Sequence, residues 1–287
     1  MKERRERETP SLLLLMWLRT VNPFYARLSK NIAREISTYY AQDLLPCLSH
    51  GRLVIYNVRS GSEVAVRTSF FEASLFCLAD RETAICFRAL ESQSVLVLNL
   101  LTCLLSPLPD MGEARRCQEV IHFEGVTYVF GGLAEYKYIR TCEQFDRREG
   151  KWTYLPATSA PRHSAWPCEY EREIYLPPLY SFESIEVFTV ASRSFRFLSP
   201  SIPHGSSWVT SVSFILRGEL VVLTTDGEQA RWHVKGGEKE FRVCKLGVKA
   251  EKVHCAPVRC GKEVVWFASG QLLRLNCDTF ALQQMPV

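Results

Sequence analysis

The sequence predicts an all-β protein made of about six similar units, and three observations support this. From Arg52 onward, short runs that alternate apolar and polar residues, or are continuously apolar, are separated by turns rich in Gly, Asp, Asn and Ser. A polar or Gly turn lies between the two apolar runs of each pair, as hairpins require. One anchor position recurs every 39 to 47 residues, as in repeat arrays, at Val66, Leu105, Trp152, Phe195, Phe241 and Phe280.

The chain divides into an N-terminal segment, residues 1–45, and a β-rich part, residues 46–287. The first ten residues are highly charged and are predicted to be disordered. The pattern from Ser11 to Tyr40 predicts a short α-helical segment, because apolar residues fall on one helix face at Leu28, Ile32, Ile36 and Tyr39. The apolar run Ser11–Leu18 is too short to span a bilayer. Three Glu in its flank and the lack of a cleavage motif argue against a signal peptide.

The charge and the cysteine content limit the kinds of partner and the redox environment that the protein can have. The 287 residues include 35 basic and 31 acidic residues, and a net charge of +4 does not indicate a nucleic-acid partner. There are 11 cysteines, an odd number, and several lie inside apolar runs, where a thiol acts as a small core residue. This usage predicts a reduced, cytoplasmic protein rather than a disulfide scaffold.

The stretch from Tyr128 to Arg162 contains the most specific motif. An apolar strand ends in two glycines, a second strand ends near an Asp, a third begins with Trp, and Pro and Arg follow. This order resembles the kelch repeat, which builds β-propellers from units of ~50 residues. The residues that carry the resemblance are Gly131, Gly132, Trp152, Pro156 and Arg162. The preceding unit has the same offsets at Leu105, Pro109 and Arg115.

The resemblance implies a kelch-like β-propeller of about six blades with an incomplete N-terminal blade. Six hairpins of third and fourth strands are predicted, but only five pairs of first and second strands. The first hairpin, Arg52–Thr68, lacks inner strands, and Leu44–Leu48 is the candidate for one of them. Five blades with an appended hairpin is the alternative. The N-terminal helix is a candidate cover for the open side, since propellers leave few edges exposed.

The N-terminal segment also resembles the start of an F-box. The resemblance rests on a helix with a Glu-Ile pair and a following Asp-Leu-Leu, and its docking positions are Leu28, Ile32, Glu35, Ile36, Leu44 and Leu45. Ser29 stands where the family has Pro, and the later helices of an F-box are missing. The resemblance implies docking on a ubiquitin-ligase scaffold, with the propeller selecting the substrate. An amphipathic helix packed against the propeller is the alternative.

No catalytic or metal site and no cofactor are expected from the sequence. The six histidines form no pair at i, i+4, and no HExxH, CxxC, GxSxG or glycine-rich phosphate motif occurs. The nearest approach to a ligand cluster is His254-Cys255 with Cys260, and it lacks a fourth ligand.

The expected function is non-catalytic protein binding on a face formed by inter-blade loops, as the kelch resemblance implies. Aromatic and Arg side chains anchor interfaces, and the candidates near predicted loops are Tyr136, Lys137, Tyr138, Arg140 and Trp166. Trp152, Arg115 and Arg162 are instead expected to hold blades together. Two alternatives remain: a propeller enzyme acting on carbohydrates, of oxidase or epimerase type, and a degenerate kelch scaffold with no link to a ligase.

Overall fold

The computed structural model describes residues 44–286 except for short segments. These are 50–51, 58–61, 68–72, 81, 89, 101, 103, 164–165, 178, 181–184, 199–207, 217–218, 225–227, 234–241, 246–256, 261, 269–270 and 280. The predicted N-terminal helix, with Leu28, Ile32, Glu35 and Ile36, therefore lies outside the described residues. The described residues contain no α-helix, and therefore no helix long and apolar enough to cross a membrane.

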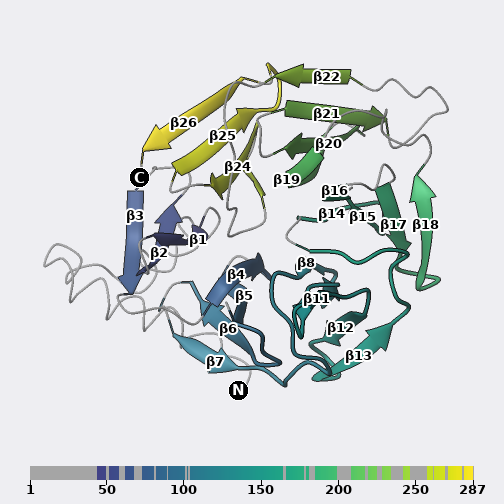
Figure 1. Ribbon diagram of the computed structural model, residues 1–287. Coiled ribbons are helices and arrows are strands. Elements are labelled where there is room, and N and C mark those ends of the chain that lie inside the picture. The colour runs from purple at the N-terminus through teal and green to yellow at the C-terminus, as the bar shows by residue number, and fades with distance from the viewer. Residues whose placement is uncertain are drawn as a thin grey trace, which may run out of the picture.

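The strands form antiparallel sheets arranged around a common axis, as in a propeller (Figure 1). Four of the sheets have four strands each, and in these the strands lie in chain order from the centre of the ring to its rim. The first of these sheets contains β4 (Ala73–Leu78), β5 (Thr83–Arg88), β6 (Val95–Asn99) and β7 (Leu105–Pro107). The second contains β8 (Glu119–Phe123), β9 (Val126–Phe130), β12 (Cys142–Asp146) and β13 (Lys151–Leu155).

The other two four-stranded sheets follow the same order. One contains β14 (Cys168–Tyr170), β15 (Glu173–Leu176), β17 (Ile185–Thr189) and β18 (Ser194–Leu198). The other contains β23 (Val258–Cys260), β24 (Glu263–Ala268), β25 (Gln271–Asn276) and β26 (Leu282–Pro286). Between them lies a five-stranded sheet of β16 (Leu179–Tyr180), β19 (Trp208–Leu216), β20 (Glu219–Thr224), β21 (Glu228–His233) and β22 (Arg242–Lys245).

The predicted hairpins are present in the structure. All six third–fourth pairs form, namely β2–β3, β6–β7, β12–β13, β17–β18, β21–β22 and β25–β26. All five first–second pairs form as well, namely β4–β5, β8–β9, β14–β15, β19–β20 and β23–β24. The pattern therefore located these hairpins, although β23 covers Val258–Cys260 where the sequence predicts a turn after Val258.

The N-terminal sheet has three strands, β1 (Leu44–Ser49), β2 (Arg52–Asn57) and β3 (Ser62–Arg67). Its inner strand β1 is the Leu44–Leu48 candidate, and it pairs with β2 from Leu44 opposite Asn57 to Ser49 opposite Arg52. Pro46 fits there because β1 is an edge strand, where a missing N–H costs little. Leu44 and Leu45 are thus buried strand residues, and their prediction as docking positions of a helix is wrong.

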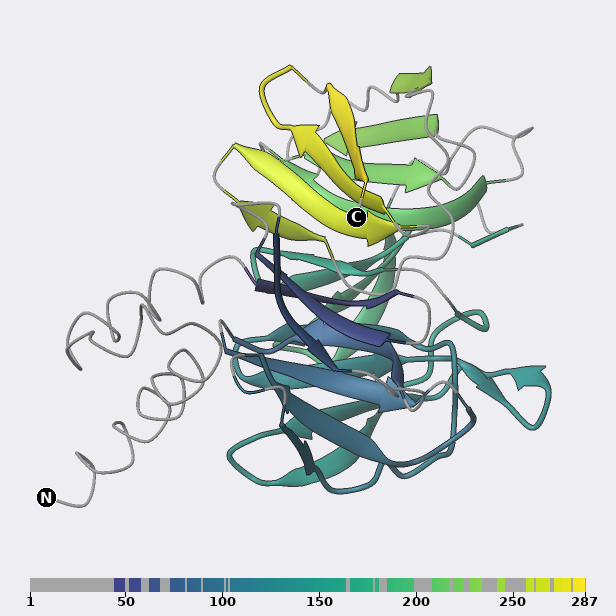
Figure 2. The same ribbon diagram turned by 90° about the vertical axis from the view of Figure 1, so that its left-hand side faces the viewer.

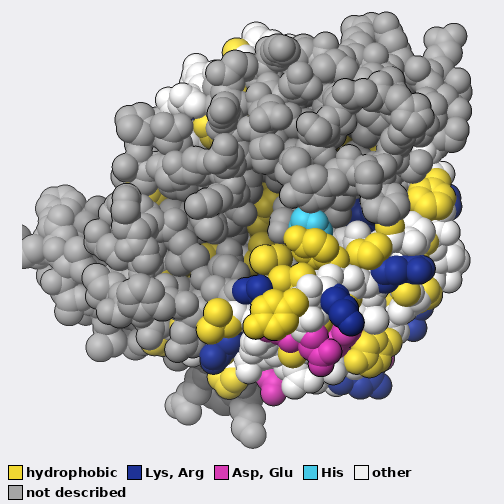
Figure 3. All heavy atoms as spheres, viewed as in Figure 1, with side chains coloured by type: hydrophobic (Ala, Val, Ile, Leu, Met, Phe, Trp, Pro, Cys, Tyr) yellow, Lys and Arg dark blue, Asp and Glu magenta, His cyan; other side chains and the backbone are white. Residues whose placement is uncertain are grey.

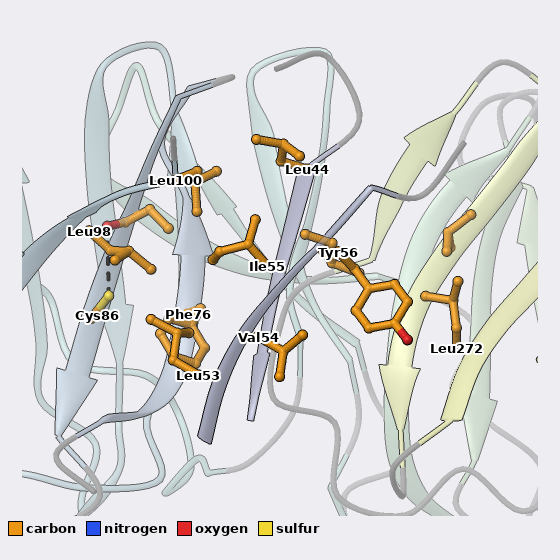
Figure 4. Packing of buried hydrophobic residues seen from close by; sticks show 13 residues of the cluster. Leu44, Leu53, Val54, Ile55, Tyr56, Phe76, Cys86, Leu98, Leu100 and Leu272 are labelled. Atoms are coloured by element: carbon orange, nitrogen blue, oxygen red, sulfur yellow. Dashed lines mark hydrogen bonds between the residues drawn. The ribbon is translucent and has the colours of Figure 1, made fainter. Parts of the chain in front are cut away.

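This three-stranded sheet packs between the first and the last four-stranded sheets. Side chains alternate across β2, so Leu53 and Ile55 face Phe76 and its neighbours, whereas Val54 and Tyr56 lie on the side of Leu272 (Figure 4). All of these residues belong to one buried cluster. Figure 2 shows the same relation from the side, with the yellow C-terminal strands beside the purple N-terminal ones. The first and last sheets are therefore in contact.

Each remaining hydrophobic cluster fills the space between two consecutive sheets. Val120 and Val129 pack with Ile85 and Phe87 between the sheets that begin with β4 and β8. The next three clusters join the sheet of β8 to that of β14, that of β14 to that of β19, and that of β19 to that of β23. The core is a series of inter-sheet layers, because no single sheet can bury both of its faces alone.

Candidate functional site

A pair of glycines ends β9 and redirects the chain out of its sheet. Gly131 has φ 60° and Gly132 has φ 115°, a region that L side chains avoid. The N–H of Gly132 donates a hydrogen bond to the carbonyl oxygen of Arg162 at 2.7 Å. A Cβ on Gly132 would lie 2.9 Å from the carbonyl oxygen of Arg116, so there is no room for a side chain. The close backbone approach explains why glycine is needed there.

Arg115 is fully buried beside these glycines, and its two terminal nitrogens donate to four acceptors. Its guanidinium donates to a Glu143 carboxylate oxygen at 2.6 Å and to a Glu113 carboxylate oxygen at 3.1 Å. It also donates to the carbonyl oxygens of Gly131 and Thr141, each at 2.8 Å. Glu143 in turn accepts the backbone N–H of the segment that carries Arg115. Arg115 thereby joins the chain before β8 to strand β12 of the same sheet.

Arg162 links two neighbouring sheets, because it contacts Glu119 of β8 and Glu186 of β17. Its Nε donates to Glu119 at 3.0 Å, a second nitrogen lies 3.7 Å from Glu186, and its guanidinium also donates to the Pro177 carbonyl. Both carboxylates are buried. Burial raises the pKa of Glu119, Arg162 lowers it, and the neighbouring Glu186 raises it again, so that the net change is upward. One guanidinium therefore serves two buried carboxyl groups.

The other kelch positions lie at the rim of these sheets. The Trp152 ring is partly buried on β13, packs 5.2 Å from the Phe145 ring, and donates its indole N–H to the Pro109 carbonyl at 2.8 Å. Leu105 is partly buried against the core, whereas Pro109 and Pro156 are exposed.

Immediately after the glycines, the chain forms a two-stranded hairpin of β10 (Leu133–Ala134) and β11 (Lys137–Tyr138). The two residues that join the strands, Glu135 and Tyr136, have φ 48° and 62°. Positive φ at both central residues is the conformation of a type I′ turn, which usually contains Asn or Gly. The Tyr136 side chain is 91% exposed at the tip.

Aromatic and basic side chains continue along β11. The Tyr138 ring is 53% exposed and stacks on the buried His163 ring, with ring centroids 4.0 Å apart. Arg140 is exposed and donates through Nε to the Thr158 carbonyl at 2.5 Å. On the other side, the Glu135 backbone N–H donates to a Glu91 carboxylate oxygen at 3.0 Å. The hairpin is therefore held to the ring at its base while its tip is solvent-exposed.

The structure brings together four of the five predicted partner-binding residues. Tyr136, Lys137 and Tyr138 lie on this hairpin, and Arg140 lies in the segment between β11 and β12. Trp166 does not join them, because its side chain is only 2% exposed and packs with Phe214 and Trp266 between two sheets. Its prediction as a partner contact is wrong. The stacking partner His163 was not predicted, since a contact across 25 residues leaves no pattern in the sequence.

The face of the ring seen in Figure 1 has a mixed surface. Its described part carries apolar, basic and acidic side chains next to one another (Figure 3). Elsewhere on the described surface, exposed cations pair with carboxylates, as in Arg147–Asp80 at 3.3 Å and Arg172–Glu124 at 2.8 Å. Among the described residues, Lys137 has no such partner. The hairpin thus offers a cation and two aromatic rings to an incoming surface.

The described residues offer no metal site and no activated thiol among the cysteines at Cys77, Cys142 and Cys168. They contain no group of three or more His, Cys, Asp or Glu residues that could hold a metal ion. His254 and Cys255 of the sequence-level cluster lie outside the described residues. Burial raises the pKa of the thiols of Cys77, Cys142 and Cys168 to about 12, so these side chains are protonated at neutral pH and act as apolar core groups.

A comparison with protein families agrees with this geometry. The family model described as "Kelch motif" matches residues 114–158, which span Arg115, the glycine pair, the hairpin and the β12–β13 pair. No curated protein matches the chain. The matched motif and the propeller-like arrangement of sheets together support a kelch-repeat β-propeller, a fold consistent with a protein-binding scaffold.

Proposed function

We propose that this chain is a non-catalytic, protein-binding propeller of six blades that holds a protein partner on the hairpin β10–β11. In this proposal the three-stranded sheet is the incomplete N-terminal blade. The five-stranded sheet is a blade that has gained β16 from the preceding loop. The loop face that carries the hairpin is the binding face.

One observation carries the proposal. Tyr136, a large aromatic residue, is 91% exposed at the tip of a turn whose two central residues have positive φ. A non-Gly residue in this conformation costs about 1–2 kcal/mol, and a turn optimised for stability alone would have Asn-Gly there. Tyr is among the residues that dominate binding energy at interfaces. A strained turn that exposes the Tyr136 side chain is best explained if this side chain contacts a protein partner.

We further propose that the N-terminal residues recruit a ubiquitin-ligase scaffold in the cytoplasm, so that the propeller acts as a substrate adaptor. Support comes from the F-box-like pattern at Leu28, Ile32, Glu35 and Ile36. Within the described residues the core begins at Leu44 on the inner strand of the first sheet. A segment attached there is physically coupled to the ring.

The first experiment tests the hairpin. Wild-type chain, Tyr136→Ala and Tyr154→Ala are expressed in cells, and proteins captured by each are quantified by mass spectrometry. Tyr154 is the matched control, because it is an exposed Tyr on the rim strand β13. We expect at least one captured protein to fall about tenfold or more with Tyr136→Ala, as for a hot-spot residue, and to be unchanged with Tyr154→Ala. Equal capture by all three chains would refute a hairpin site.

The second experiment tests the adaptor role separately. A chain lacking residues 1–43 keeps every described strand. We expect this chain to lose ubiquitin-ligase scaffold proteins while retaining the partners that depend on Tyr136. If the full chain captures no ligase component, the adaptor role is wrong, and the binding role of the hairpin is unaffected.

A further inference from the structure

A cavity of about 680 Å³ lies at the opposite end of the strands from the hairpin. It is lined from the inner strands of five sheets, with at least one residue each from β4, β8, β14, β19 and β23. The lining includes Cys77, His122, Glu169, Tyr170, Phe214 and Val258. His122 is near the end of β8, and β9 runs back from there to the hairpin, which separates this cavity from the proposed partner site.

Glu169 gives the cavity its charge. No Lys or Arg belongs to the described lining, and Glu169 is its only carboxylate. Other carboxylates nearby are paired, since Glu124 lies 2.8 Å from Arg172 and Glu173 lies 2.6 Å from Arg196. Within the described part of the chain, Glu169 has neither a hydrogen bond nor an ion pair from its side chain. Glu169 is an exposed residue, and the partial desolvation of its carboxyl group raises the pKa, which repulsion by Glu124 raises further.

The remaining polar groups of the wall are neutral. His122 accepts or donates a hydrogen bond at 2.9 Å to the Thr127 hydroxyl, and burial lowers the pKa of the imidazole. Burial raises the pKa of the Cys77 and Cys168 thiols to about 12. Tyr170 and Phe214 add aromatic rings, whose faces attract cations. The wall thus has apolar surface, aromatic rings and one negative charge.

We propose that this cavity binds a small organic cation, a protonated amine or quaternary ammonium group on an apolar body, with Glu169 as its counter-ion. The cavity has the volume of typical small-molecule sites, about 300–1,000 Å³, and such sites combine apolar walls with a few polar groups. A cation would supply the partner that the Glu169 carboxylate lacks. A neutral ligand would gain no attraction from this exposed carboxylate, and an anion would be repelled by it.

The test uses two probes of similar shape, 2-phenylethylammonium chloride and the neutral 2-phenylethanol, titrated into the full-length chain and followed by calorimetry and by NMR. Three chains are compared: wild type, Glu169→Gln and Glu149→Gln. Glu149 is the control because it is an exposed carboxylate in the turn between β12 and β13, away from the cavity.

We expect the ammonium probe to bind wild type at least fivefold more tightly than the alcohol does. Glu169→Gln should weaken the ammonium probe about fivefold and leave the alcohol unchanged, whereas Glu149→Gln should change neither by more than about twofold. The NMR signals of His122 and Tyr170 should shift on binding. Equal affinity of wild type and Glu169→Gln for the ammonium probe, no saturable binding below ~10 mM, or shifts confined to other residues would each overturn the proposal.

Discussion

At the scale of single residues, the periodic arginines are explained by where their carboxylate partners lie. Arg115 reaches Glu143, the second residue of β12, and Arg162 reaches Glu186, the second residue of β17. In the next unit the Arg position is Gly205, and the second residue of β21 is Gln229. Arg and Glu are thus both present or both absent, because a buried charge without its partner is costly.

Arg162 is expected to contribute more to stability than any exposed cation of the chain. Arg162→Met would leave Glu119 and Glu186 buried without a counter-charge, and breaking a buried pair in this way costs about 3–5 kcal/mol. We expect the free energy of unfolding, measured by urea denaturation, to fall by this amount.

The control for Arg162→Met is Arg172→Met, which breaks the exposed pair of Arg172 with Glu124. Exposed pairs contribute at most about 1 kcal/mol, because water and salt screen them. Similar losses for the two variants would show that the buried network does not contribute more than a surface pair.

At the scale of elements, the strands of three or more residues could be predicted from the sequence, and the two-residue strands could not. The longer strands show either a continuous apolar run, as in β6, or alternation of apolar and polar residues, as in β12, and both patterns indicate a strand. The hairpin β10–β11 has two residues per strand, too few for a period, and Glu135-Tyr136 is not a usual type I′ pair. The loop around Tyr136 was predicted to be a binding loop, but its conformation depends on contacts made by Glu91 and His163.

The prediction for Trp166 failed for a related reason. The sequence puts Trp166 near a predicted loop, where aromatic side chains are expected to face solvent. The residue does precede β14, but its side chain fills the layer between two sheets, and the Ser213 hydroxyl donates to its carbonyl at 2.5 Å. Ser213 is 47 residues away in the sequence. Burial against a distant strand depends on the tertiary arrangement, which the local pattern around Trp166 does not contain.

The residues of the type I′ turn are expected to lower the free energy of unfolding and to be needed for binding the partner. Replacing Glu135 and Tyr136 with Asn and Gly would place residues suited to positive φ at both positions. Tyr136 is almost fully exposed, so its loss should remove little packing. We expect the double variant to gain about 1 kcal/mol in free energy of unfolding and to lose the Tyr136-dependent partner.

Glu135→Asn alone separates the two effects. This variant keeps the Tyr136 ring and relieves only one of the two positive-φ positions, so it should gain part of the stability and retain the partner. A loss of stability in the double variant would mean that Tyr136 supports the fold, and the binding argument would then lose its main support.

At the scale of the whole molecule, the ring depends on contacts between the two ends of the described chain. One buried cluster contains Leu45 of β1, Phe76 of β4, and Leu272 of β25. The first sheet therefore has neighbours on both sides, as closure of a propeller requires. Among the described residues this sheet has three strands, and β1 forms its inner edge with Leu44 and Leu45 buried.

This arrangement predicts a sharp boundary between residues 43 and 50 in the effect of N-terminal deletion. Deleting residues 1–43 retains β1, whereas deleting residues 1–50 removes it together with Leu44 and Leu45. Losing one buried Leu side chain costs about 2–5 kcal/mol, and a change of 1 kcal/mol shifts the melting temperature of a chain of this size by about 2–4 °C. We therefore expect the shorter chain to melt at least about 10 °C below the longer one, or not to fold.

The point variant Leu45→Ala in the full-length chain covers the case in which the shorter chain does not fold. Hydrogen exchange in this variant should become faster in β2 and also in β24 and β25, since the same cluster joins the first and last sheets. The exposed Leu104, changed to Ala, should leave exchange unchanged in these strands. Faster exchange in β2 alone would mean that the first sheet is attached to only one neighbour, and that the ring is held together without a contact between its ends.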